Sequence, residues 1–212
     1  IDRTLGRLLI NATVDGLTAL SQWSMNNMLN SGLKIKNVAV TPNGLEDLAF
    51  KKPDEQEIDQ VFKDGIESYK PFVLSLARID RVKNIETMIR VISLIKEPCN
   101  LLIAGDVGDQ KYFEELQKNI GKHNVNKRVI FLGFVPRELK YYLISKCFCY
   151  LQLSRSEGFS NATQEAMSQD KICIVTKNTA LEELVKNGVS GFTVNSDDAE
   201  SVAKKISFLH SR

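Results

Sequence analysis

The sequence predicts an α/β domain with a doubly wound parallel sheet, and two observations carry this prediction. From residue 71 onward, short apolar runs alternate with segments in which apolar residues recur every three or four positions. The apolar runs are nearly continuous, as is typical of strands that helices cover on both faces. Right-handed crossovers are expected to join such strands.

The order of these segments defines the expected elements. In the first helix Ile85, Met88, Ile89 and Ile92 share one face, and Pro136 stands near the first turn of a later helix. We expect strands at residues 71–77, 101–105, 128–132, 147–153, 172–175 and 191–194. We expect helices at residues 85–95, 109–122, 136–146, 161–168, 181–186 and 197–210.

The first 70 residues do not follow this alternation. They contain an expected strand, helix and strand at residues 17–21, 22–30 and 38–41, a turn at residues 42–44, and then a polar stretch with some helix. We therefore divide the chain into residues 1–44, a remnant of another domain, residues 45–70, a linker, and residues 71–212, a complete domain. Because the chain begins with Ile1, we interpret it as a piece of a longer protein.

Composition excludes several classes of protein. Of the 212 residues, 43% are hydrophobic and 25% charged, which is typical of a globular domain and not of a disordered chain. The apolar runs are too short to span a membrane. A net charge of +2 argues against a nucleic-acid binder that depends on bulk charge. Four cysteines without a C-x-x-C pair indicate reduced core thiols and a cytoplasmic protein.

The candidate site follows from the rule that open parallel sheets bind ligands outside the carboxyl ends of their strands. Arg78 and Lys83 follow the first strand of the domain, and Glu157 and Glu165 follow the fourth. Other candidates after strand ends are Gly105, Asp106, Gly133, Phe134, Val135, Gly158, Phe159, Ser160 and Asn161. The alternative for any one cation is a solvated loop with a surface ion pair.

This set of residues suits a diphosphate. Arg78 can donate two parallel hydrogen bonds to phosphate oxygens, and Lys83 adds a point charge. The helix that begins near Asn161 directs free N–H groups toward the same anion. Glu165 lies about one turn into that helix, where its carboxylate can accept hydrogen bonds from two ribose hydroxyls.

Five segments resemble one family in order and spacing. Residues 157–167 resemble the E-G-F-x-x-x-x-x-E-A-M segment of retaining glycosyltransferases with the GT-B fold (family four, group 1). Residues 76–85 resemble the family's G-R-L-x-x-x-K-G/N segment, although Ala77 and Asn84 stand where glycine is common. Residues 102–106, 131–135 and 38–44 resemble its second-strand end, its base-binding loop and its V-x-P-N-G segment.

The resemblance implies a role for each candidate residue. Glu165 would hold the nucleotide ribose, Arg78 and Lys83 the diphosphate, and Glu157 would lie by the transferred sugar as a binding residue or a nucleophile. The backbone of residues 158–161 would meet the sugar and phosphate, and residues 133–135 would cradle the base. Residues 1–44 would be the end of the acceptor-binding domain, and residues 71–212 the donor-binding domain.

The activity implied is hexosyl transfer from a UDP-, GDP- or ADP-sugar to a glycan or lipid-linked acceptor, in glycan, cell-wall or lipopolysaccharide biosynthesis. Since no D-x-D occurs, we expect no metal or other cofactor. The expected place of action is the cytoplasm, and a peripheral contact with the inner face of the membrane stays open. We expect the isolated 212-residue chain to be inactive. A sugar-nucleotide epimerase and a non-catalytic nucleotide-binding module stay open as alternatives.

Overall fold

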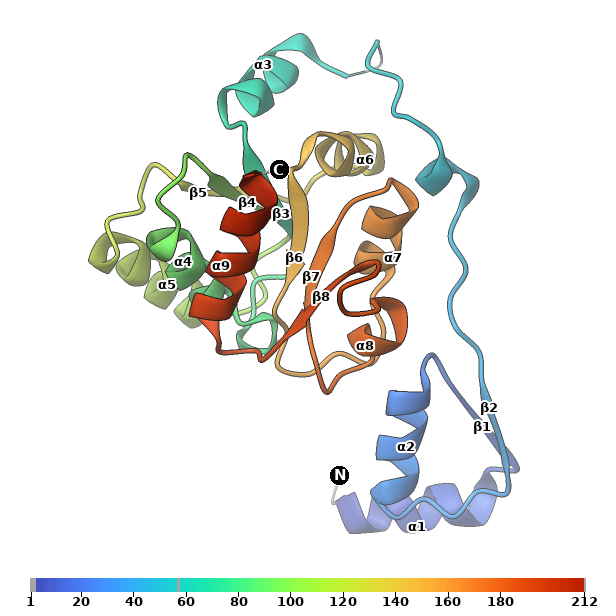
Figure 1. Ribbon diagram of the computed structural model, residues 1–212. Helices are drawn as coiled ribbons and strands as arrows, with labels where there is room; N and C mark the ends of the chain where they lie inside the picture. Colours follow the sequence, from blue (N-terminus) through green and yellow to red (C-terminus); the bar gives the residue numbers. More distant parts are fainter. Residues whose placement is uncertain (1–2, 57, 212) are drawn as a thin grey trace.

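The computed structural model describes residues 3–56 and 58–211, with side chains from residue 6 onward. A sheet of six parallel strands forms its centre, in the order β5-β4-β3-β6-β7-β8 (Figure 1). This is the doubly wound arrangement that the sequence predicts, so the predicted fold class is confirmed. The strands are β3 (Phe72–Leu76), β4 (Asn100–Ala104), β5 (Val129–Gly133), β6 (Cys149–Gln152), β7 (Cys173–Thr176) and β8 (Gly191–Val194).

Helices cover both faces of this sheet, because successive strand residues point to opposite sides. Val73 packs into a core with α4 (Ile85–Leu94), α5 (Gln110–Lys122) and α9 (Ala199–His210). Its neighbour Leu74 packs into a second core on the other face. The helices of that face are α6 (Arg137–Lys146), α7 (Asn161–Ser168), α8 (Leu181–Leu184) and α3 (Gln60–Ser68).

The segment before the sheet domain forms a small unit of its own (Figure 1). Strands β1 (Gly16–Ala19) and β2 (Asn37–Val40) pair in parallel, and α2 (Gln22–Asn30) connects them. The predicted strand, helix and strand are thus present. Helix α1 (Arg3–Thr13) has no counterpart in the sequence prediction, and α3 and the 3-10 helix η1 (Asp47–Phe50) lie within the predicted linker.

Several predicted boundaries differ from the structure by one or two residues. Strand β6 begins at Cys149 and not at residue 147, since Cys147 caps the end of α6. Helix α8 ends at Leu184 and not at residue 186, because Val185 is extended. Within the part of the chain that the structure describes, no helix is long and apolar enough to cross a bilayer.

Asn84 shows why the loop after β3 has its shape. Its backbone is left-handed (φ 55°), a conformation that asparagine adopts more readily than most residues. Its buried amide donates to the carbonyl groups of Leu153 and Ser196, at 3.1 and 2.7 Å. Asn84 therefore replaces the glycine of the family pattern and also anchors the short 3-10 helix η2 (Arg81–Lys83), which carries Lys83 toward the end of β6.

Candidate functional site

The candidate site lies where β3 and β6 meet, at the point where the order of strands along the sheet reverses direction. Connections leave β3 and β6 on opposite sides there, which leaves a crevice at their carboxyl ends. An open pocket of about 380 Å³ occupies this position. The residues that line it are Leu76, Ala77, Arg78, Lys83, Gln152, Glu157, Phe159, Ser160, Asn161 and Ala162.

Lys83 and Glu157 form the charged centre of this pocket. The Nζ atom of Lys83 lies 2.7 Å from Oε2 of Glu157, and both side chains are largely shielded from solvent. The same oxygen accepts hydrogen bonds from the Gln152 amide (2.6 Å) and the Ser154 hydroxyl (3.1 Å). Glu157 is therefore fixed by three donors, whereas Lys83 is a cation at the wall of an open pocket.

Arg78 stands at the rim, with 68% of its side chain exposed. Its Nε atom donates to Asp80 at 2.9 Å, so this hydrogen bond uses Nε and not the terminal nitrogens. Gly108 is close behind it, since a Cβ at that position would lie 2.8 Å from Cδ of Arg78. Arg78 can therefore reach an anion in the pocket through its guanidinium without breaking the Asp80 contact.

Helix α7 points its first turn into the pocket. Ser160 is its N-cap, and its hydroxyl accepts the backbone N–H of Thr163 at 3.1 Å. The first N–H groups of a helix have no partner within the helix and carry a partial positive charge. Together with Lys83 and Arg78, this helix end gives the pocket the chemistry of an anion site.

Glu165 lies on α7 one turn beyond the pocket lining, and it is 9% exposed. Lys140 of α6 binds its Oε1 at 2.6 Å, and the same ammonium group lies over the Tyr141 ring. The Tyr141 hydroxyl donates to Glu46 at 2.8 Å. Burial and this hydrogen bond raise the pKa of Tyr141, so the hydroxyl stays protonated and keeps donating.

Of the other predicted residues, Gly158 is in the loop after β6 and does not line the pocket, and five lie at the ends of the neighbouring strands β4 and β5. The N–H of Gly105 donates to the carbonyl of Gly133 at 2.8 Å, which joins the ends of β4 and β5. Asp106 accepts the N–H of Ile79 through its carbonyl, and Phe134 is 71% exposed. Gly105, Asp106, Gly133, Phe134 and Val135 are thus at the predicted edge but outside the lining of the 380 Å³ pocket.

Helix α2 of the preceding segment touches the site loop. The hydroxyl groups of Ser21 and Ser24 donate to the carbonyl of Gly158, at 2.7 and 2.9 Å. Glu183 accepts the N–H groups of Gln22 and Trp23 on its two carboxylate oxygens, at 3.0 and 2.6 Å. The N-terminus of α2 is therefore capped by the sheet domain, next to Glu157.

Sequence reasoning did not single out several of these residues. Gln152 could have been found, because a glutamine inside an apolar strand run is unusual. Lys140, Tyr141 and Glu183 gave no such signal, since their partners Glu165, Glu46 and Trp23 lie 25, 95 and 160 residues away in the sequence. Among the residues that the structure describes, no group of three or more His, Cys, Asp or Glu side chains could hold a metal ion.

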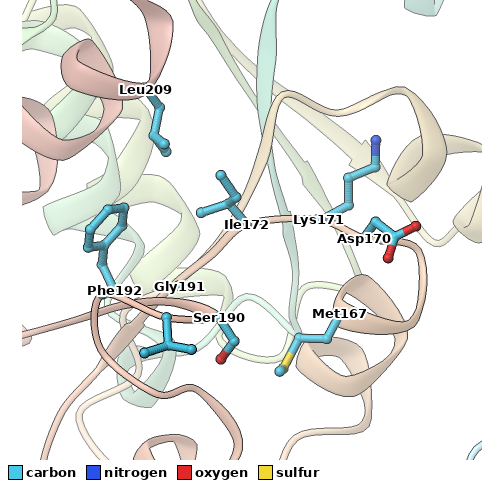
Figure 2. Close-up of a pocket in the computed structure, with 10 residues that line it drawn as sticks. Met167, Asp170, Lys171, Ile172, Ser190, Gly191, Phe192 and Leu209 are labelled. Atoms are coloured by element: carbon cyan, nitrogen blue, oxygen red, sulfur yellow. The ribbon is translucent and has the colours of Figure 1, made fainter. Parts of the chain in front are cut away.

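A second pocket, of about 330 Å³, lies at the opposite edge of the sheet (Figure 2). Ile172 precedes β7 and Gly191 begins β8, so this pocket is at the amino ends of those strands. Figure 2 shows Phe192, Leu209 and Met167 around it. None of the predicted site residues lines it, which separates it from the site described above.

The fold and the site define a class, namely α/β domains that bind a ligand at the switch point of a parallel sheet. Comparison with known proteins then gives the family. Residues 56–211 match the family described as Glycosyl transferases group 1, and the chain belongs to this family. The membership in group 1 that the five sequence segments predict is thereby confirmed.

Two curated relatives illustrate the match. An N-acetylgalactosaminyltransferase of Campylobacter jejuni, which acts on a diphospho-undecaprenol-linked sugar, is 29% identical over 169 residues; the match covers 79% of this chain and 45% of the relative. An uncharacterized glycosyltransferase of Methanocaldococcus jannaschii is 30% identical over 141 residues, covering 66% and 35%. The chain therefore spans less than half the length of these relatives.

Solved structures agree on the fold. Anabaena HepE in complex with UDP and glucose superposes with a TM-score of 0.88 at 24% identity, over 97% of this chain and 56% of that one. Sucrose-phosphate synthase of Thermosynechococcus elongatus gives a TM-score of 0.83 at 20% identity, over 99% and 52%. At these identities the likeness establishes a GT-B fold, of which this chain corresponds to the C-terminal half.

Proposed function

We propose that this chain is the donor-binding half of a retaining glycosyltransferase that transfers a hexosyl group from a nucleoside diphosphate sugar. The observation that carries the proposal is the pocket between β3 and β6, where Lys83, Arg78 and the first turn of α7 meet. Three sources of positive charge converge on a space with one largely shielded acid, Glu157. A diphosphate with an attached sugar matches both the charge and the polarity of this space.

The chemistry follows from the charges that develop during transfer. Breaking the bond between the anomeric carbon and a phosphate oxygen leaves negative charge on the diphosphate and positive charge on the sugar ring. Lys83 and Arg78 bind the leaving group more strongly as its charge grows, which lowers the barrier. Such cations can take the part that a divalent metal plays in other transferases, so we propose a metal-independent reaction.

Glu157 and Glu165 would have different tasks. Glu157 is held by Gln152, Ser154 and Lys83, which suits a carboxylate that must keep its position beside a sugar with developing positive charge. Glu165 binds Lys140 in this structure, and we propose that ribose hydroxyls join Lys140 as donors to its carboxylate. The base would then lie over residues 133–135, at the end of β5.

The acceptor is proposed from the relatives. The Campylobacter relative acts on an undecaprenol-linked substrate, and we propose a glycan or lipid-linked acceptor for this protein, in glycan, cell-wall or lipopolysaccharide biosynthesis. The work would take place in the cytoplasm, with a peripheral contact at the membrane. Because the chain spans less than half of its curated relatives, we expect it to bind donor without transferring sugar.

Calorimetric titration with UDP, GDP, ADP and their glucose, N-acetylglucosamine or mannose conjugates tests the proposal. We expect the nucleotides of one base to bind. Arg78→Ala should lower their affinity at least tenfold, because a charged hydrogen bond of about 1.5–3 kcal/mol is lost. Lys118→Ala, on the exposed face of α5, serves as the matched control. Absence of binding to every nucleotide would instead favour a module with another ligand.

A further inference from the structure

Among the polar residues that line the candidate pocket, Gln152 is the most deeply buried. It is the last residue of β6 and is 3% exposed, between the fully buried Leu151 and Leu153. A carboxamide without partners at such a position would cost stability. The amide group must therefore be satisfied by groups of the pocket, and its contacts show which ones.

The two ends of the amide contact different parts of the site. Its Nε2 atom donates to Glu157 Oε2 at 2.6 Å. Its Oε1 atom accepts from the Ser160 hydroxyl at 2.7 Å and from the Thr163 hydroxyl at 2.9 Å. The assignment of nitrogen and oxygen follows from chemistry, because an ionised carboxylate only accepts. Ser160 already accepts the Thr163 N–H, so its own proton is available to Gln152.

We propose that Gln152 is a positioning residue for donor binding, an inference that rests on the proposed function. It joins the acid beside the sugar, Glu157, to the N-terminus of α7 beside the phosphates. With donors from Gln152 and Ser154, Glu157 keeps its place when Lys83 turns from it toward a diphosphate. Without Gln152, Glu157 depends more on Lys83 and competes with the nucleotide for that cation.

Two substitutions separate this role from simple packing. Gln152→Met keeps the size but can neither donate to Glu157 nor accept from Ser160. Gln152→Glu keeps the shape, and its behaviour depends on protonation: the acid form donates an O–H and accepts at its carbonyl, as the amide does, whereas the carboxylate repels Glu157. Glu157 contacts residue 152, with Lys83 beyond it, and Arg78 lines the same pocket. The Tyr150 hydroxyl also donates to Gln152 Oε1 at 3.2 Å, and burial raises the pKa of Tyr150.

The test is calorimetric titration of wild type and both variants with the nucleotide sugar that wild type binds among the UDP, GDP and ADP conjugates, at about pH 5 and about pH 8. We expect Gln152→Met to weaken binding about tenfold relative to wild type at both pH values, as the loss of a charge-assisted hydrogen bond predicts. At about pH 8 we expect Gln152→Glu to bind the nucleotide sugar at least as weakly as Gln152→Met does. At about pH 5 we expect its affinity to recover to within about threefold of that of wild type.

Three results would overturn the proposal or its basis. Binding of Gln152→Met within about twofold of wild type removes the positioning role. If the ratio of the dissociation constants of Gln152→Glu and wild type is the same at both pH values, Gln152 has a packing role alone. This variant decides the question if circular dichroism shows that Gln152→Met does not fold. A wild-type chain that binds none of the nucleotide sugars contradicts the proposed function itself, which distinguishes that failure from the failure of Gln152.

Discussion

The ammonium nitrogen of Lys83 lies 2.7 Å from the carboxylate oxygen Oε2 of Glu157, although 74 residues separate them in the chain. The contact exists because η2 follows β3 and the loop of Glu157 follows β6, and these two strands are neighbours at the centre of the sheet. The fold thus assembles a charged pair from two distant segments. In our account a diphosphate replaces Glu157 as the main partner of Lys83.

The first prediction concerns Lys83. Lys83→Met should weaken nucleoside diphosphate binding by one to two orders of magnitude, because the cation is lost and Glu157 then faces the phosphates unpaired. Isothermal titration with UDP, GDP and ADP measures the change, with Lys118→Met as control. If the salt dependence of binding is the same for Lys83→Met and wild type, Lys83 does not contact the phosphates.

A second prediction concerns the sugar of the nucleotide. If Glu165 accepts hydrogen bonds from ribose hydroxyls, wild type should bind the ribonucleotide about tenfold more tightly than its 2′-deoxy analogue. Glu165→Ala should remove most of this preference, since no carboxylate is left to read the hydroxyl. Competition titrations with the paired nucleotides give both ratios. An undiminished preference in Glu165→Ala would assign ribose recognition to another residue.

A third prediction concerns the backbone at the end of β4. Gly105 has φ +152°, and a Cβ there would lie 2.2 Å from the carbonyl oxygen of Ala77. Gly105→Ala should therefore lower the free energy of unfolding by about 2–4 kcal/mol. Gly121→Ala is the matched control, because Gly121 lies within α5 and a Cβ added there would meet no atom within 4 Å. We expect this variant to raise the free energy of unfolding by about 0.5–1 kcal/mol. Urea titration of both variants checks the contrast.

The contact between α2 and the sheet domain provides a fourth prediction. The Glu183 carboxylate accepts two N–H groups at the start of α2, and glutamine can accept only on its oxygen and carries no charge to oppose the helix dipole. Glu183→Gln should loosen α2. Trp23 is the sole tryptophan and is partly buried, so its emission should shift to the red.

The neighbouring Glu182 serves as the control for this experiment. It accepts the N–H of Asn178 and caps no part of α2, so Glu182→Gln should leave the emission of Trp23 unchanged. Equal spectra for Glu183→Gln and wild type would show that the two capping hydrogen bonds do not hold α2 in place.

The fifth prediction concerns the thiols. All four cysteines are free and buried, and burial raises the pKa of Cys147 to about 12 and that of Cys99 to about 11. A disulfide-exchange reagent at about pH 8 should label none of them in the folded chain and all four in denaturant, because the thiolate is the reactive form. Since the unfolded thiols ionise first, the free energy of unfolding should fall as pH rises above the ordinary thiol pKa near 9. Rapid labelling before unfolding would contradict the burial.

The sheet and its helices were predictable because their signal is local. Each strand from β3 to β8 is a short apolar run, and each helix of the domain except the short α8 repeats its apolar residues at helical spacing. Helix α1 was not predicted, and its apolar residues Leu8 and Leu9 are in fact exposed. Its segment is outside the βα alternation, which was the pattern that guided the prediction.

The site was predictable in its position more than in its contacts. The rule on strand ends selects Arg78, Lys83 and Glu157, and the structure brings these three to one pocket. The rule could not show that Gln152 and Ser154 share an oxygen of Glu157 with Lys83, or that Lys140 binds Glu165. Such pairings depend on side-chain geometry between elements, for which the sequence carries no spacing rule.

The most direct measurement is a crystal structure of the chain with the nucleotide sugar that it binds in titration. The account predicts the diphosphate between Lys83 and Arg78 at the start of α7, and a ribose hydroxyl on the carboxylate of Glu165. A nucleotide bound elsewhere, with Lys83 still on Glu157 and no ribose oxygen near Glu165, would contradict it.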